Sequence, residues 1–242
     1  MAVPLRASST PASLQGLREQ IERAERRRAD TAIIPVSAPL VPLFFDGGLK
    51  PGATYAIDSS VSVMLSLMAE TSTAGSWCAA VGFDSLAAEA VEGFGITLER
   101  FVMVPNPGTR WLAVVAALAE VIPVIAIRPP SRPRDADISR LSARLRERGG
   151  VLLVLGEWPG AEATLSLSET SWRGIGQGYG ALQSRAVTIS ARGRRFPAAR
   201  RARVLLPGPS GAVVAFTPAA SSVTPIDSPA PADRRAHLTV VA

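Results

Sequence analysis

Short apolar runs alternate with helical segments along the first two thirds of the chain, and this alternation limits the fold more than any other feature. The predicted strands cover residues 53–57, 77–81, 101–104, 121–127 and 151–155. Apart from Thr54, these runs are apolar, which is typical of strands buried on both faces of a sheet. Strands separated by helices form parallel βαβ units. We therefore predict an α/β fold in three layers, with a mostly parallel central sheet.

The segments between these strands carry helical signals. The predicted helices cover residues 61–70, 85–93, 110–120 and 137–148. Asp84 is a candidate N-cap of the second helix, and Gly149 is a natural stop for the last one. Three prolines bar a helix from residues 30–43, so this segment is expected to be extended: Pro35, Pro39 and Pro42.

Beyond Trp158 the pattern changes. Residues 165–168 alternate between leucine and serine, and the stretches 186–191, 202–206 and 212–217 are typical of strands. We predict that these strands add to one edge of the sheet in antiparallel order. The glycine-rich residues 172–180 are expected to form a flexible loop. We therefore divide the chain into three parts: an N-terminal arm at 1–30, one domain at 31–217, and a disordered, proline-rich tail at 218–242.

The N-terminal arm contains a candidate amphipathic helix at residues 14–29. Leu14, Leu17 and Ile21 recur at helical spacing and form a narrow apolar stripe. Such a helix is marginal alone, so the stripe needs a surface to pack on. That surface is either the protein's own core or another protein.

Composition excludes several kinds of chemistry. The chain has one cysteine and one histidine, Cys78 and His237. Cys78 lies in an apolar run and is expected to be a buried, inert thiol. His237 lies in the tail, and no cysteine–histidine cluster is available for zinc. We therefore expect no catalytic residue, no metal and no cofactor. With no long apolar run and no signal peptide at its start, the protein is expected to be soluble and cytoplasmic.

A series of short motifs lies between residues 44 and 160. It begins with the glycine-led turn at 47–52 and the strand that follows it. It continues through residues 75–81, the turn at 93–96 and the strand at 121–127. In this order of elements the segment resembles the core of the RecA family, and more narrowly its ImuA branch. The resemblance implies a RecA-like three-layer core.

The nucleotide motifs of that family are missing. A phosphate loop needs glycines, whose backbone wraps the phosphates, and a lysine. Residues 58–63 contain neither, and Asp58 puts a negative charge there. The strand at 121–127 runs into Arg128 and two prolines, where a Walker B strand would end in an aspartate that holds magnesium. Asp84 lies near the position of the catalytic glutamate in RecA cores. Its alternative role is that of a helix cap. We therefore predict a pseudo-ATPase, a protein that keeps the RecA-like fold but neither binds nor hydrolyses ATP.

The pattern is closest to the mycobacterial ImuA-prime group, which lacks these motifs too. The resemblance implies a non-enzymatic accessory protein of DNA repair, acting in translesion synthesis and mutagenesis after DNA damage, as part of the SOS response. Its partners would be an ImuB-type inactive homologue of Y-family polymerases and, indirectly, an error-prone C-family polymerase. Two alternatives stay open: a RecA-like protein that binds single-stranded DNA, and a SulA-like inhibitor of cell division.

Positive charge points to an anionic partner. The formal net charge is +6, and arginines are densest between residues 185 and 203. Together with the apolar stripe, the candidate binding residues are Arg192, Arg194, Arg195, Arg200, Arg201 and Arg203. Because this stretch has no neighbouring carboxylates in sequence, we expect these arginines to be uncompensated. They would contact DNA phosphates or an acidic protein, or form a solvated hairpin. Self-association is a further expectation. The segment 128–134 is either a partner-binding loop or a stiff connection.

Overall fold

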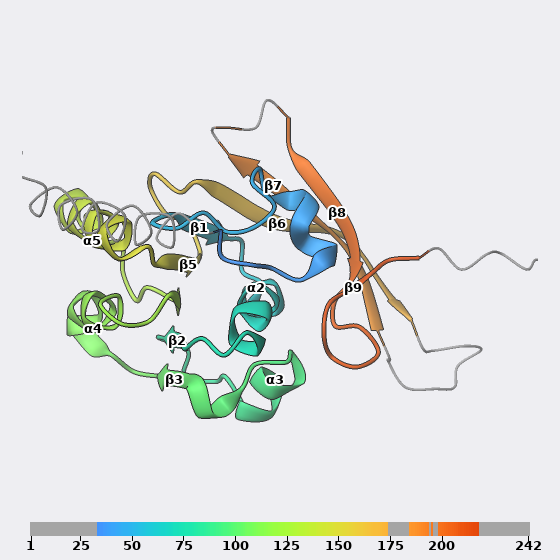
Figure 1. Ribbon diagram of the computed structural model, residues 1–242, viewed down its shortest axis with the longest axis horizontal. Coiled ribbons are helices and arrows are strands. Elements are labelled where there is room, and N and C mark those ends of the chain that lie inside the picture. Colours follow the sequence, from blue (N-terminus) through green and yellow to red (C-terminus); the bar gives the residue numbers. More distant parts are fainter. Residues whose placement is uncertain (1–32, 174–183, 194, 196–197, 218–242) are drawn as a thin grey trace, which may run out of the picture.

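The computed structural model describes residues 33–173, 184–193, 195 and 198–217 (Figure 1). Several sequence predictions therefore lie outside the described residues. They are the helix at 14–29 with Leu14, Leu17 and Ile21, most of the glycine-rich loop, Arg194, and the tail at 218–242.

A mixed sheet forms the centre of the described structure. Its strands are β1 (Thr54–Ile57), β2 (Cys78–Val81), β3 (Phe101–Val104), β4 (Val124–Ile127), β5 (Val151–Leu155), β6 (Ala163–Arg173), β7 (Ser184–Gly193), β8 (Arg200–Leu205) and β9 (Val214–Ala215). They lie side by side in the order β3-β2-β4-β5-β1-β6-β7-β8-β9. Neighbours from β3 to β6 are parallel, and those from β6 to β9 are antiparallel. The predicted α/β class, parallel core and antiparallel C-terminal additions are confirmed.

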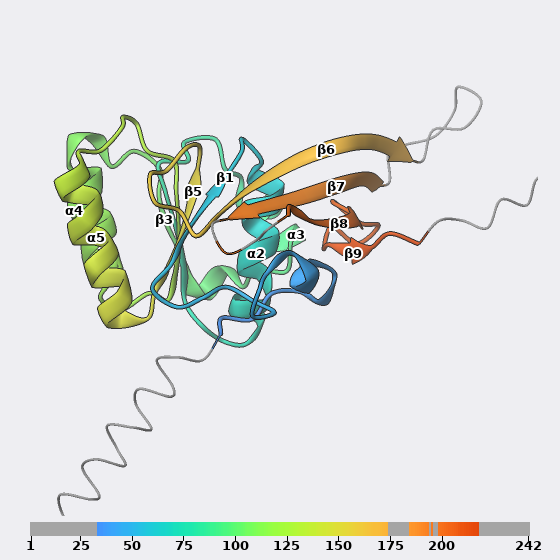
Figure 2. The same cartoon turned by 90° about the horizontal axis from the view of Figure 1, so that it is seen from above.

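Helices cover the parallel part of the sheet on both faces (Figure 2). They are α2 (Val61–Thr73), α3 (Ala88–Gly93), α4 (Trp111–Leu118) and α5 (Asp135–Arg148), with 3-10 turns η1 (Ala38–Leu43), η2 (Leu98–Arg100) and η3 (Gly108–Arg110). Helices α2 and α3 share one apolar cluster with η1, and α4 and α5 share the other. The three predicted layers are therefore present.

The two faces of the antiparallel strands differ. Buried residues of β6, β7 and β8 join the cluster around α2 and η1; they include Leu165, Ile189 and Val204. Over their opposite face, no helix of the described chain lies on the sheet (Figure 2). An antiparallel sheet tolerates this arrangement when the uncovered face is polar.

Three predictions about local structure were wrong. Residues 38–43 are not extended but form η1, because prolines at fixed φ fit a 3-10 turn, and Leu40 and Leu43 are buried there. Asp84 does not cap a helix: α3 begins at Ala88, after Leu86 has packed against the core. Residues 121–123 still belong to the turn after α4, so β4 starts at Val124.

Other boundaries agree with the sequence. Strands β3 and β5 have the predicted limits. Helix α5 ends at Gly149, which adopts the left-handed conformation with φ 70°. None of the helices described has the length and apolar character that a bilayer crossing requires.

Candidate functional site

A crevice lies at the carboxyl edge of the parallel strands. In open α/β sheets, ligand sites form at this edge, because several strand ends and their loops meet there. Strands β4, β5 and β1 are neighbours and end side by side. The cavity beside them has a volume of about 890 Å³ and is lined by Asp58, Pro129, Ser131, Arg132, Pro133, Leu155, Gly156, Glu157, Trp158, Pro159, Thr164 and Ser166.

The loop between β1 and α2 has only three residues, Asp58, Ser59 and Ser60. The backbone N–H of Asp58 donates to the carbonyl oxygen of Leu165 at 2.8 Å. The Ser60 hydroxyl caps α2 by accepting from the backbone N–H of Val63 at 3.3 Å. A phosphate loop turns such N–H groups toward the ligand, whereas here protein oxygens already accept from both.

Charge in the crevice also disfavours a triphosphate. Asp58 and Glu157 bring two carboxylates, and Arg132 is the one cation among the described lining residues. Two like charges about 4 Å apart repel by about 4 kcal/mol at an effective dielectric of 20. Among the described residues, no group of three or more His, Cys, Asp or Glu side chains could hold a metal ion.

At the rim of the crevice, the residues that follow β2 and β4 lie close together. The backbone N–H of Arg128 donates to Val81 at 2.9 Å, and its guanidinium lies 5.1 Å from the centre of the Phe83 ring. Gly82 has φ 83°, and a Cβ there would lie 2.4 Å from the Arg128 carbonyl oxygen. Four residues of the segment 128–134 line the crevice. Its role in binding a partner stays a prediction.

Cys78 is buried, as predicted. Burial raises the pKa of its thiol to about 12. The thiol lies 3.9 Å from the carbonyl oxygen of Met68 and has no exposed surface. Such a thiol is not a nucleophile near neutral pH.

Two arginines of the basic segment are compensated, which corrects the sequence prediction. Arg195 lies 3.3 Å from an Asp46 carboxylate oxygen and 3.6 Å from one of Glu162. Its guanidinium also lies 4.5 Å from the centre of the Phe45 ring. These partners are far away in sequence, and only folding brings them together.

Arg203 is compensated in a different way. It lies 3.6 Å from a Glu169 carboxylate oxygen, and its guanidinium lies 4.6 Å from the centre of the Phe216 ring. Glu169 belongs to β6, at an irregularity in its pairing with β7, and has φ 51°. Residues 169 and 203 meet because β6, β7 and β8 are neighbours in the sheet.

The remaining arginines divide between two places. Arg200 donates to the carbonyl oxygen of Phe44 and so ties β8 to the residue after η1. Arg192 and Arg201 are exposed, and within the described part of the chain no carboxylate lies at ion-pair distance from either. The structure therefore keeps Arg192, Arg201 and Arg203 on one surface but assigns Arg195 and Arg200 to internal contacts.

That surface, which we call the outer face, is the uncovered side of β6, β7 and β8. Strand register places its residues in three rows: Thr164 with Arg192; Ser166 with Ser190 and Arg201; Ser168 with Thr188 and Arg203. These hydroxyl residues were not among the candidates predicted from the sequence. The leucine–serine alternation at 165–168 contained the signal, but the pairing that puts arginines beside the serines is not visible in one sequence.

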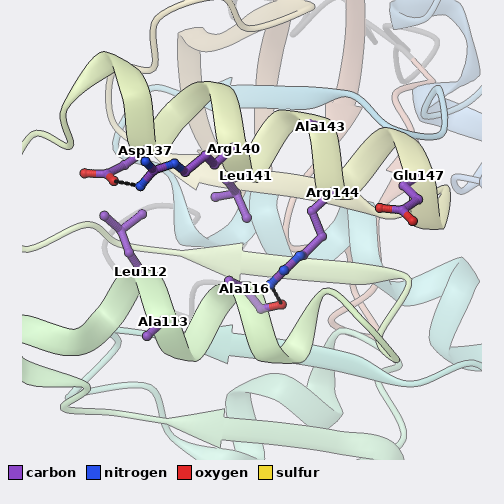
Figure 3. Close-up of a pocket in the computed structure, with 9 residues that line it drawn as sticks. All are labelled: Leu112, Ala113, Ala116, Asp137, Arg140, Leu141, Ala143, Arg144 and Glu147. Atoms are coloured by element: carbon purple, nitrogen blue, oxygen red, sulfur yellow. Dashed lines mark hydrogen bonds and ion pairs between the residues drawn. The ribbon is translucent and has the colours of Figure 1, made fainter.

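A second cavity, of about 470 Å³, lies between α4 and α5 (Figure 3). Arg144 reaches across it and donates to the carbonyl oxygen of Ala116 at 3.3 Å, and it lies 2.9 Å from a Glu120 oxygen. On the same helix, Arg140 pairs with Asp137 at 3.8 Å. The contacts of Arg144 join α5 to α4 and to the turn after it, so we regard the groove as part of the packing of these helices.

Comparison with known proteins finds similarity over this part of the chain. Residues 42–160 match the family model described as the MT3502 N-terminal domain. The uncharacterized protein Rv3395c of Mycobacterium tuberculosis (strain ATCC 25618 / H37Rv) is 28% identical over 155 residues, which are 60% of this chain and 76% of the relative. The matched region contains all five strands from β1 to β5. Neither description names a RecA-like or ImuA protein, so that resemblance stays a prediction.

Proposed function

We propose that this protein is a non-enzymatic adaptor in damage-induced, error-prone translesion DNA synthesis. The observation that carries the proposal is the loop at the end of β1. The Asp58 amide donates to a carbonyl oxygen, and the Val63 amide at the start of α2 donates to the Ser60 hydroxyl. Asp58 also stands where a triphosphate would need positive charge. A protein that keeps the core of its fold but lacks the catalytic residues can still function by binding other molecules.

The partner follows from the resemblance to the ImuA branch. We infer direct binding to an ImuB-type homologue of Y-family polymerases, and indirect contact with an error-prone C-family polymerase, in the cytoplasm. The net charge of +6 supports an anionic partner surface. Candidate contacts are the apolar stripe of the N-terminal arm and the exposed arginines of the outer face.

The test uses the purified full chain and the ImuB-type protein encoded in the same genome. Isothermal titration should give a stoichiometric complex with a micromolar or tighter dissociation constant. The variant Leu17→Asp with Ile21→Asp should weaken the complex if the arm is the contact. Arg18→Gln, on the charged side of the same predicted helix, is the matched control.

A cellular measurement tests the role itself. Cells without this protein should show fewer damage-induced mutations, and the wild-type chain should restore them. If the mutation frequency does not change and the purified proteins do not bind each other, the adaptor hypothesis is wrong. Hydrolysis of ATP by the pure chain would contradict it as well.

A further inference from the structure

We propose that the outer face of β6, β7 and β8 binds the phosphodiester backbone of duplex nucleic acid. This ligand differs from the polymerase homologue proposed above, although both proposals use the exposed arginines of the outer face. It rests on the arrangement of side chains on a sheet surface that no described helix covers (Figure 2).

The geometry of the rows suits phosphate groups. Each of the three rows places one arginine beside at least one hydroxyl residue that is exposed or half-buried, as in Ser166, Ser190 and Arg201. In the third row this residue is Ser168, because Thr188 is buried. Neighbouring strands are about 4.8 Å apart, and successive residues on one face of a strand are about 6.7 Å apart. Arginine, serine and threonine side chains are the usual donors to phosphate oxygens. The rows therefore present three guanidinium groups, one for each of three phosphates.

The rows also carry positive charge that no carboxylate neutralises. Arg192 and Arg201 lack a carboxylate partner in the described part of the chain, so their charges are available to an anion. Arg203 is partly neutralised by Glu169, which also accepts a hydrogen bond from the Thr188 hydroxyl at 2.6 Å.

Carboxylates lie at both ends of the rows. Glu169 lies at one end, and at the other end Asp58 and Glu157 line the crevice together with Thr164 and Ser166. The uncompensated positive charge of the rows is therefore that of Arg192 and Arg201.

The composition of the rows favours a duplex. The three rows contain no aromatic residue, and the one ring placed beside them above, that of Phe216, faces the Arg203 guanidinium at 4.6 Å. The rows therefore lack the aromatic platform on which unpaired bases stack in single-strand sites. Without stacking, affinity depends on charge density, and a duplex carries one negative charge per roughly 1.7 Å of its axis. An acidic protein is less suitable, because protein interfaces depend on apolar anchors in pockets, and the rows are polar.

The experiment measures binding of the full chain to a fluorescent duplex of random sequence, by anisotropy, at several salt concentrations. Three phosphate contacts predict a slope of about −2.7 for the logarithm of affinity against that of salt. Arg192→Gln and Arg201→Gln should each lower affinity by about tenfold at 0.1 M salt and reduce the slope by about one. Glu169→Gln should strengthen binding, because it removes the carboxylate beside Arg203.

The matched control is Arg140→Gln on α5, an arginine whose side chain is 82% exposed and lies outside the rows. It should leave binding unchanged. Thermal unfolding of every variant shows that it is folded. Arg192→Gln should still bind the polymerase homologue, and this result would separate the duplex site from the adaptor contact.

Three results would overturn the proposal. Equal affinity in wild type and in the Arg192→Gln, Arg201→Gln double variant would show a solvated surface. Tighter binding of a single strand than of the duplex would contradict the choice of ligand. Binding of poly-glutamate that the same variants abolish, without binding of duplex, would identify the outer face as a site for acidic protein.

Discussion

The hydroxyl of Ser60 accepts a hydrogen bond from the backbone N–H of Val63, at 3.3 Å, at the first turn of α2. In a phosphate-binding loop, N–H groups at this position point at the ligand. Here the helix supplies its own acceptor, and the preceding loop has neither glycine nor lysine. The start of α2 is therefore a capped helix terminus within a folded core.

We expect no binding of ATP, with or without magnesium. Calorimetric titration should show no heat beyond dilution. The variant Asp58→Asn should not bind either, because removing the negative charge does not supply the missing glycines and lysine. An active P-loop ATPase, titrated under the same conditions, is the positive control. A micromolar dissociation constant for the wild-type chain would contradict the pseudo-ATPase interpretation.

Gly82→Ala should destabilise the protein by about 3 kcal/mol, because the left-handed conformation and a steric clash add together. A Cβ at this position would lie 2.4 Å from the Arg128 carbonyl oxygen, and φ is 83°. Gly95→Ala is the control: φ is 85°, but a Cβ would meet nothing within 4 Å. It should cost about 1 kcal/mol. Urea denaturation measures both, and equal losses would show that the contact with Arg128 does not matter.

The parallel half of the fold could be predicted from sequence because each element carries a local signal. Strands such as β3 and β5 are continuous apolar runs, and α5 has an apolar stripe and a terminal glycine. Predictions from local sequence were wrong where contacts with distant parts of the chain determine the conformation of a segment. Leu40 and Leu43 are buried in a 3-10 turn that the prolines allow, although the prolines exclude an α-helix.

The candidate sites were harder to predict. The missing phosphate loop is visible in the sequence, because it concerns residue types in one short stretch. Which arginines pair with carboxylates is not visible in the sequence, because Arg195 and its partner Asp46 are 149 positions apart. The outer face has the same difficulty: serines on β6 and arginines on β8 share a surface only through the pairing of both strands with β7.

Stability should fall at alkaline pH. Burial raises the pKa of Tyr55 from 10.0 to about 12, and that of Cys78 from 9.0 to about 12. Both groups are neutral when protonated, so the unfolded chain loses these protons at lower pH than the folded one. The free energy of unfolding should therefore be unaffected by them below about pH 9 and decrease as pH rises toward 12.

Tyr55→Phe tests this prediction. The variant loses the bond that the Tyr55 hydroxyl accepts from the backbone N–H of Lys50 at 2.9 Å, so it should be less stable at neutral pH. Its free energy of unfolding should also depend less on pH above about 10, because one ionising group is gone. An unchanged slope in urea denaturation at alkaline pH would mean that Tyr55 is not the group responsible.

The last prediction distinguishes structural arginines from binding arginines. Arg195→Ala should destabilise the protein by about 1 kcal/mol, because it removes two ion pairs, which are screened at the surface, and a contact with the Phe45 ring. Arg201→Ala should change stability by less than about 0.5 kcal/mol, since no ion pair holds that side chain within the described chain. Thermal and urea unfolding of both variants give the comparison.

Asp46→Asn should lower stability in the same direction as Arg195→Ala, and the double variant should lose less than the sum of the two, because each change removes the same pair. Equal stability of the Arg195→Ala and Arg201→Ala variants would show that the contacts of Arg195 contribute nothing, and its charge would then be available for binding like that of Arg201.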